Sequence, residues 1–226
     1  MEEQQLYNMV TVIGLLGMAG AGKTTTAEYL VNKDPNKYTL LQMRDVAKEE
    51  YDQTVEHGVS YLPTEIVNQS TDDDVIDKLT ATGDFEAEIS TWVDTILSYD
   101  NQYFAKKATE KIKHEADTND VWIVDGLRTV ADVTQIENGF ENTEFIFLYT
   151  PFPIRAERLQ ARGGRNEDNL EKIFERDSRE LEWGLKTILT QAEQNDTPYT
   201  ITYVPAHETD NYNPITHVQE QIKTIN

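Results

Sequence analysis

The chain has 226 residues, which suits one domain with a full core, and it has no cysteine, which excludes disulfides, thiolate nucleophiles and cysteine-ligated metal sites. Its formal charge of −21 disfavours nucleic acid or an anionic membrane as a partner, although such a charge is also typical of proteins from a high-salt cytoplasm. No stretch approaches the roughly 18 consecutive apolar residues of a membrane span, and the N-terminus MEEQQ is acidic, so we expect a soluble, cytoplasmic protein.

Short apolar runs alternate with longer amphipathic stretches, which is typical of βαβ units around a parallel sheet. The first run, MVTVIGLL, is nearly continuous, as expected of a central strand covered on both faces. Strands are predicted at residues 9–16, 37–43, 121–126, 144–150 and 199–204. Helical spacing predicts helices at residues 23–32, 103–115, 154–162 and 170–194. The sequence therefore predicts an α/β fold.

The segment at residues 45–118 interrupts this alternation. It is too long for an ordinary crossover, it is rich in acidic residues, and it contains helical patterns at residues 64–68 and 85–97. Long structureless loops are uncommon in compact domains, so we predict a helical insertion that covers an edge of the sheet.

Residues 17–24, GMAGAGKT, match the pattern G-x-x-x-x-G-K-[ST] at every fixed position. In this motif, main-chain amides and a helix N-terminus surround phosphate oxygens. Lys23 is expected to reach the β- and γ-phosphates, and the Thr24 hydroxyl is expected to coordinate Mg²⁺. A glycine-rich turn that only caps a helix is the alternative. The predicted nucleotide-binding residues are Gly17, Ala19, Gly20, Ala21, Gly22, Lys23, Thr24 and Thr25.

A second candidate lies in VWIVDGLR, where an apolar strand ends in Asp125. A carboxylate at the carboxyl end of a neighbouring strand lies beside the phosphate loop and can hold Mg²⁺ directly or through water. Gly126 permits the close approach of a substrate, and Arg128 offers a planar guanidinium to a second anion. The alternatives are a turn or helix-cap role for Asp125 and a surface salt bridge for Arg128.

Six of the eight arginines lie between residues 155 and 179. They are Arg155, Arg158, Arg162, Arg165, Arg176 and Arg179. The first three share one face of a helix, since they are spaced by three and four residues, and Gly163-Gly164 ends that helix. The last two lie three residues apart on a returning helix. We therefore predict an arginine-rich lid over residues 155–184 that clamps phosphates; surface salt bridges to neighbouring glutamates are the alternative.

The Walker A loop, the D-G-x-R strand end and the R-D-x-R-E-L-x-W-G return helix together resemble the P-loop nucleotide kinases of the adenylate kinase and dephospho-CoA kinase type. The sequence is most similar to a largely archaeal group of kinase-like proteins with G-I-R after the third strand and R-D-x-R-E-L after the lid. The resemblance covers residues 10–44 and 100–204. It implies a single three-layer P-loop domain with a five-stranded parallel sheet in the order 2-3-1-4-5. It also implies ATP with Mg²⁺ as the donor and a small phosphorylated acceptor.

The resemblance also implies roles for single residues. Asp125 would serve the metal or the acceptor, and Arg128 would contact the acceptor. The lid pair Arg162 and Arg165 would lie near the adenine and phosphates. The transferred group would face Arg176 and Arg179.

One position departs from the pattern of nucleoside monophosphate kinases. These enzymes usually place an arginine three residues after an aspartate at the end of the second strand, whereas here Asp45 is followed by Lys48. A lysine keeps the charge but lacks the two-pronged guanidinium, which Arg44 next door could supply. The predicted substrate-binding residues are Arg44, Lys48 and Arg128.

We therefore predict an ATP-dependent phosphotransferase for a small nucleotide-like acceptor, of the nucleoside monophosphate or dephospho-CoA type. One alternative is a nucleotide-dependent switch that binds a protein through the acidic insertion. Another is a kinase for nucleic-acid ends, which the net charge disfavours. The predicted catalytic residues are Lys23, Asp125, Arg162, Arg165, Arg176 and Arg179, and the predicted metal ligands are Thr24 and Asp125.

Overall fold

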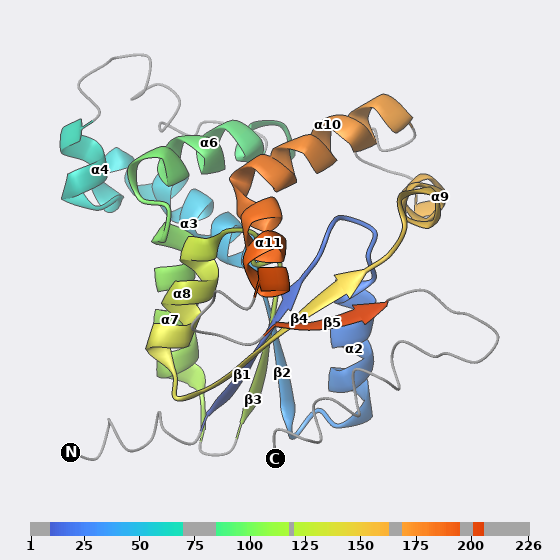
Figure 1. Cartoon of the computed structure of the whole chain (residues 1–226). Helices are drawn as coiled ribbons and strands as arrows, with labels where there is room; N and C mark the ends of the chain where they lie inside the picture. The colour runs from blue at the N-terminus through green and yellow to red at the C-terminus, as the bar shows by residue number, and fades with distance from the viewer. Residues whose placement is uncertain (1–9, 70–84, 118–119, 163–168, 195–200, 206–226) are drawn as a thin grey trace.

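The computed structural model describes residues 10–69, 85–117, 120–162, 169–194 and 201–205. Its five strands form one parallel sheet in the order β2-β3-β1-β4-β5, which confirms the predicted class and strand order (Figure 1). The strands are β1 (Thr11–Leu16), β2 (Tyr38–Gln42), β3 (Val121–Asp125), β4 (Asn142–Tyr149) and β5 (Ile201–Pro205). The α-helices are α2 (Lys23–Lys33), α3 (Met43–His57), α4 (Thr64–Gln69), α6 (Phe85–Tyr99), α7 (Tyr103–Glu115), α8 (Val130–Gly139), α9 (Phe152–Arg162), α10 (Leu170–Glu180) and α11 (Lys186–Gln194).

Helices cover both faces of the sheet, which explains the continuous apolar run in β1 (Figure 1). On one face, Ile13 and Leu15 of β1 pack with Leu30 of α2. On the other face, Val12 and Leu16 belong to a core to which α7, α8 and α11 contribute. The β1 side chains that point to either face of the sheet are therefore buried, and β1 lies in the middle of a three-layer structure.

The topology brings two segments that lie far apart in the chain to the same edge of the sheet. In the parallel register, Leu15 of β1 lies beside Asp125, the last residue of β3. The loop at residues 17–22 leaves β1 at this edge, and β2 ends beside it with Gln42 next to Asp125. A polar site can form here because the strand ends, unlike their middles, leave the core.

The described part of residues 45–118 is helical and has a small core of its own. Its α3, α4, α6 and α7, with a short 3₁₀ turn η1 (Val59–Tyr61), enclose Tyr51, Ile66, Trp92 and Phe104. The buried Glu50 on α3 accepts hydrogen bonds from the hydroxyls of Tyr61 and Tyr103. This network joins three of the elements that surround the insertion's core.

Three helical features differ from the sequence-based expectations. Helix α3, which begins at Met43 directly after β2, is not among the expected helices. Charged residues interrupt its buried positions, so its amphipathic pattern is weak. Helix α8 is also absent from the expectations, although Thr129 and Asp132 form a reciprocal capping box at its start.

The prediction of one helix over residues 170–194 is wrong. Gly184, with a φ of 143°, bends the chain within a π-helical turn, η2 (Leu181–Leu185), between α10 and α11. A Cβ at this position would lie 3.1 Å from the Cα of Thr129, so the bend brings residues 181–185 against the segment that follows β3.

Candidate functional site

The glycine-rich loop between β1 and α2 has the backbone shape that a phosphate site requires. Gly20 and Gly22 have positive φ angles, of 75° and 96°, which glycine adopts without strain. Gly22 is the N-cap of α2, so the first amides of that helix belong to the same loop, where a helix N-terminus suits a phosphate. Gly17 serves the turn itself, because a Cβ there would lie 2.5 Å from the Leu148 carbonyl oxygen.

Lys23 lies across this loop. Its Nζ donates hydrogen bonds to the carbonyl oxygens of Gly17, at 2.7 Å, and Met18, at 3.2 Å. Burial lowers the pKa of Lys23, and the carboxylates of Asp125 and Glu180 act in the opposite direction. The ammonium group is thus fixed inside the site with two carboxylates close enough to influence it.

Asp125 and Thr24 form the part of the site that suits a metal ion. The Thr24 hydroxyl donates to Asp125 Oδ2 at 2.6 Å, although 101 residues separate the two in the chain. The other carboxylate oxygen, Oδ1, is buried and has no hydrogen-bond partner among the described residues. A hydroxyl beside a carboxylate with an unused oxygen fits Mg²⁺, which prefers oxygen ligands.

One cavity of about 1160 Å³ joins the loop, the end of β3, the insertion and α10. It gathers most of the predicted site residues, which come from five separate parts of the chain. Those that line it are Ala19, Gly20, Ala21, Gly22, Lys23, Thr24, Thr25, Arg44, Asp125, Arg128, Arg162, Arg176 and Arg179.

Three predicted residues are not part of this lining. Gly17 lies in the turn itself, close to the Leu148 carbonyl oxygen. Lys48 is exposed and forms a salt bridge one helical turn along α3 with Asp52, so the structure does not bring it to the acceptor side as expected. Arg165 lies outside the described residues, as does the Gly163-Gly164 pair.

The cavity is a local exception to the negative charge of the protein. Among the described residues, seven cationic side chains line it and four acidic ones do: Glu28, Asp125, Asp132 and Glu180. A protein with a net charge of −21 thus concentrates positive charge at the site where a polyanion would bind.

The far side of the cavity is apolar. Met43 of α3, Val93 and Leu97 of α6 and Phe104 of α7 line it, so the insertion supplies one wall. Trp183 of η2 also lines the cavity, and the Arg128 guanidinium lies 5.4 Å from the centre of its ring. The cavity therefore has a charged phosphate end and an apolar end that suits a flat or apolar group.

The arginines of α9 do not share one role as their spacing predicts. Arg158 and Arg162 line the cavity, and Arg158 Nη1 donates to the Gly20 carbonyl oxygen at 3.3 Å. Arg155 is buried in a two-pronged ion pair with Asp177 of α10 and so has a structural role.

Glu180 is a site residue that the sequence analysis missed. It is only 2% exposed, lines the cavity, and its Oε2 accepts a hydrogen bond from the Ala19 amide at 3.2 Å. Its Oε1 lies 3.5 Å from Nη2 of Arg128 and 4.0 Å from Nε of Arg176. Its spacing from Arg176 predicts a surface salt bridge, and no sequence signal places it inside the phosphate loop.

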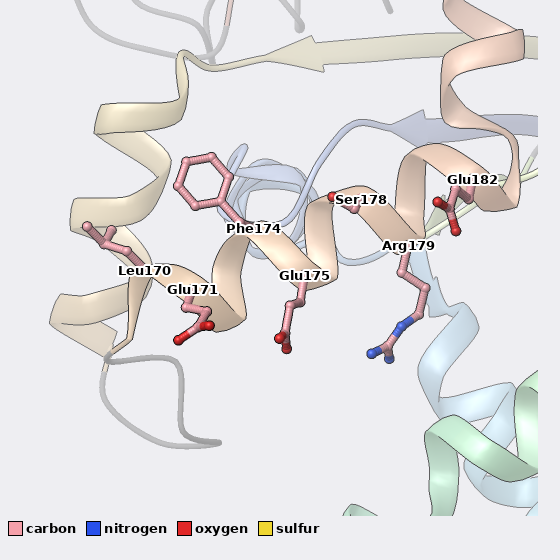
Figure 2. A pocket seen from close by; sticks show the side chains of 7 residues that line it. All are labelled: Leu170, Glu171, Phe174, Glu175, Ser178, Arg179 and Glu182. Atoms are coloured by element: carbon pink, nitrogen blue, oxygen red, sulfur yellow. The ribbon is translucent and has the colours of Figure 1, made fainter.

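A shallow groove runs along the outer face of α10 (Figure 2). In Figure 2, Glu171, Glu175 and Arg179 extend to one side of this helix, while Phe174 extends to the opposite side. The Phe174 ring stacks on Phe152 of α9, with 4.3 Å between the ring centres. Arg179 lines both this groove and the main cavity, so it lies at the opening between the site and the surface.

With this geometry, the chain is a nucleotide-binding P-loop domain. It belongs to the AAA_18 family, described as an AAA domain, whose match covers residues 13–183. A UPF0200 protein of Thermococcus onnurineus is 36% identical over 101 residues, which make up 42% of this chain and 54% of that relative. A UPF0200 protein of Pyrobaculum aerophilum is 24% identical over 187 residues, 82% of this chain and 86% of the relative.

These comparisons bear out the resemblance to a kinase-like P-loop group of archaea. The first of these two matches spans about half the length of the relative. Among solved structures, TT1252 from Thermus thermophilus shares the fold, with a TM-score of 0.54 and 15% identity over 95% of this chain and 96% of that one. Within the described ranges, no helix is long and apolar enough to cross a membrane.

Proposed function

We propose that this protein is an ATP- and Mg²⁺-dependent phosphotransferase that acts on a small nucleotide-like acceptor. The observation that carries the proposal is the continuity of the cavity. The same space reaches from the phosphate loop and Asp125 to the apolar wall of the insertion, so a donor and an acceptor can bind next to each other in one cavity.

The proposed reaction requires the protein to supply position and charge. The transition state of phosphoryl transfer is loose, and its charge is spread over equatorial oxygens. Lys23 and the loop amides would hold the β- and γ-phosphates, and Arg176 and Arg179 of α10 would stabilise the transferred group. Thr24 and Asp125 would hold Mg²⁺, which neutralises charge on the phosphates when bound.

The acceptor would occupy the other end of the cavity. Arg44 and Arg128, which also line the cavity, would supply cationic groups for an acceptor anion, and Trp183 and Val93 would offer apolar contacts for a base or a similar ring. This combination of charged and apolar groups favours a nucleotide-like molecule over a simple sugar or an amino acid.

The test is ADP release from ATP with Mg²⁺, measured against a panel of ribonucleoside and deoxyribonucleoside monophosphates and dephospho-CoA. We expect at least one of these acceptors to accelerate ADP release well above the rate with ATP alone. Slow hydrolysis that no acceptor accelerates, together with a protein partner recovered in only one nucleotide state, would instead indicate a switch.

A further inference from the structure

Glu180 places a buried carboxylate at the point where donor and acceptor would meet. It lies between the phosphate loop, through the Ala19 amide, and the acceptor side, through Arg128. It is also close enough to Lys23 to act on the pKa of that side chain. A carboxylate that contacts both the phosphate loop and Arg128 would lie beside the path of the transferred phosphoryl group.

This carboxylate has acceptor capacity that its described contacts do not use. An ionised carboxylate can accept about four hydrogen bonds. Among the described residues, Glu180 receives one hydrogen bond, from Ala19, while Arg128 and Arg176 approach at ion-pair distances of 3.5 and 4.0 Å. Carboxylate lone pairs of Glu180 are therefore available on the cavity wall to a further donor.

Whether the Glu180 carboxylate can assist the reaction depends on whether the acceptor is a phosphate or a hydroxyl group. A phosphate acceptor attacks as an anion and has no proton to lose, so a proton acceptor at this point would not assist it. A hydroxyl acceptor carries a proton that must leave as the new bond forms, and a carboxylate within reach can take it.

We infer that Glu180 accepts the proton of an acceptor hydroxyl, and that this enzyme therefore phosphorylates an alcohol of a nucleoside-like molecule rather than a phosphate. In this reaction, the hydroxyl oxygen bonds to the γ-phosphorus while the bond from that phosphorus to the β,γ-bridging oxygen breaks. The bridging oxygen leaves with its electron pair as part of ADP. The hydroxyl proton passes to the Glu180 carboxylate and from there to solvent.

This inference rests on the proposed function and narrows it. The apolar wall of Met43, Val93, Leu97 and Phe104 would hold the flat or apolar part of the acceptor. Arg128, which lies over Trp183 and beside Glu180, would orient an anionic group elsewhere on the same molecule. A nucleoside-like alcohol with a phosphate remote from the reacting hydroxyl matches both features.

The chemical form of the product tests the inference directly. The protein is incubated with ATP, Mg²⁺ and each acceptor of a panel of nucleosides, nucleoside monophosphates and dephospho-CoA, and the products are identified by ³¹P NMR. We expect a new phosphomonoester. A phosphoanhydride product would overturn the inference and leave the proposed phosphotransferase function intact, whereas no transfer to any acceptor would overturn both.

Variants of Glu180 test its role as the proton acceptor. The change Glu180→Gln keeps the shape but removes the basic group, so we expect kcat to fall by about 10²- to 10⁴-fold, with the acid limb of the pH–rate profile lost. The KM for ATP should stay within about twofold, since the loop and Lys23 are unchanged. The conservative change Glu180→Asp should recover part of kcat and the acid limb.

Two controls separate this role from a structural one. Glu175→Gln removes a carboxylate from the exposed side of the same helix, and it should leave kcat and its pH dependence as in the wild type (Figure 2). Thermal melting and binding of a fluorescent ATP analogue show whether Glu180→Gln folds and holds nucleotide. If that variant melts early or loses nucleotide while its acid limb persists, Glu180 only supports the loop and the inference is wrong.

Discussion

Arg155 and Asp177 form a buried, two-pronged ion pair that joins α9 to α10, with nitrogen–oxygen distances of 3.0 and 2.6 Å. Arg155 also donates to the carbonyl oxygens of Ala19, at 2.9 Å, and Thr150, at 3.2 Å. One guanidinium therefore ties together the phosphate loop, the end of β4 and the helix that carries Arg176, Arg179 and Glu180. This contact holds α10 against α9 together with the packing of Ile173 on Ala156 and Leu159.

We therefore expect Asp177→Ala to destabilise the protein. The change leaves the Arg155 guanidinium buried without its counter-charge, and the loss of one partner of a buried pair costs about 3–5 kcal/mol. The free energy of unfolding, measured in urea, should fall by this amount. As a matched control, Glu175→Ala on the exposed side of α10 should change it by no more than about 0.5 kcal/mol. Equal losses of unfolding free energy in the two variants would show that the Arg155–Asp177 ion pair does not stabilise the protein more than an exposed side chain does.

Lys23→Ala should abolish turnover without unfolding the chain. The Lys23 ammonium donates hydrogen bonds to carbonyl oxygens of its own loop and belongs to none of the described hydrophobic core clusters, so its loss removes positive charge from the site and leaves the core unchanged. We expect the melting temperature to stay near that of the wild type, while binding of an ATP analogue weakens and ADP release disappears. Activity retained by this variant would remove Lys23 from the mechanism.

Asp125→Asn should uncouple nucleotide binding from Mg²⁺. The carboxylate has one oxygen on the Thr24 hydroxyl and one without a described partner, and the amide would keep the first contact but lose the charge. Nucleotide should still bind in the absence of metal, while the apparent affinity for Mg²⁺ falls by about 10- to 100-fold, as for other changes around bound metals. Titration of Mg²⁺ against nucleotide binding measures this, and an unchanged Mg²⁺ affinity would exclude Asp125 as a ligand.

The sequence predicts the central features of the fold because several independent patterns agree. In β1, the apolar run requires a strand covered on both faces, and the glycines that follow it fit a phosphate loop and little else. The end of β3 at Asp125 can be predicted for the same reason, since a polar residue follows four apolar ones. The strand order came from the resemblance, because spacing alone does not say which strands are neighbours.

Other parts of the site depend on contacts that no local pattern reveals. Glu180 meets Ala19 across 161 residues of chain, and its buried position follows from the bend at Gly184 and from the packing of α10 on α9. Likewise, Arg155 and Arg158 look alike in sequence, and only the position of Asp177 decides that the first is structural. The capping box of Thr129 and Asp132 before α8 is a local pattern, so the start of that helix can be predicted from the sequence.

The hydrogen-bond network of the insertion should give the protein an alkaline stability limit. Burial, together with the neighbouring Glu50 carboxylate, raises the pKa of Tyr61 from its ordinary 10.0 to about 12, and raises that of Tyr103 as well. The folded state thus favours the protonated tyrosines. Their contribution to stability is fully present below pH 10 and is lost progressively as the pH rises towards about 12.

Urea unfolding at a series of alkaline pH values tests this assignment with Tyr61→Phe. Because phenylalanine cannot ionise, the variant should lose less free energy of unfolding than the wild type between pH 10 and about 12. At neutral pH it should be somewhat less stable, since Glu50 loses one of its two hydroxyl donors. Tyr29, which is 43% exposed on α2, provides the matched control, and Tyr29→Phe should follow the wild-type curve. If all three proteins lose stability in parallel, the alkaline limit arises elsewhere and the Glu50 network does not set it.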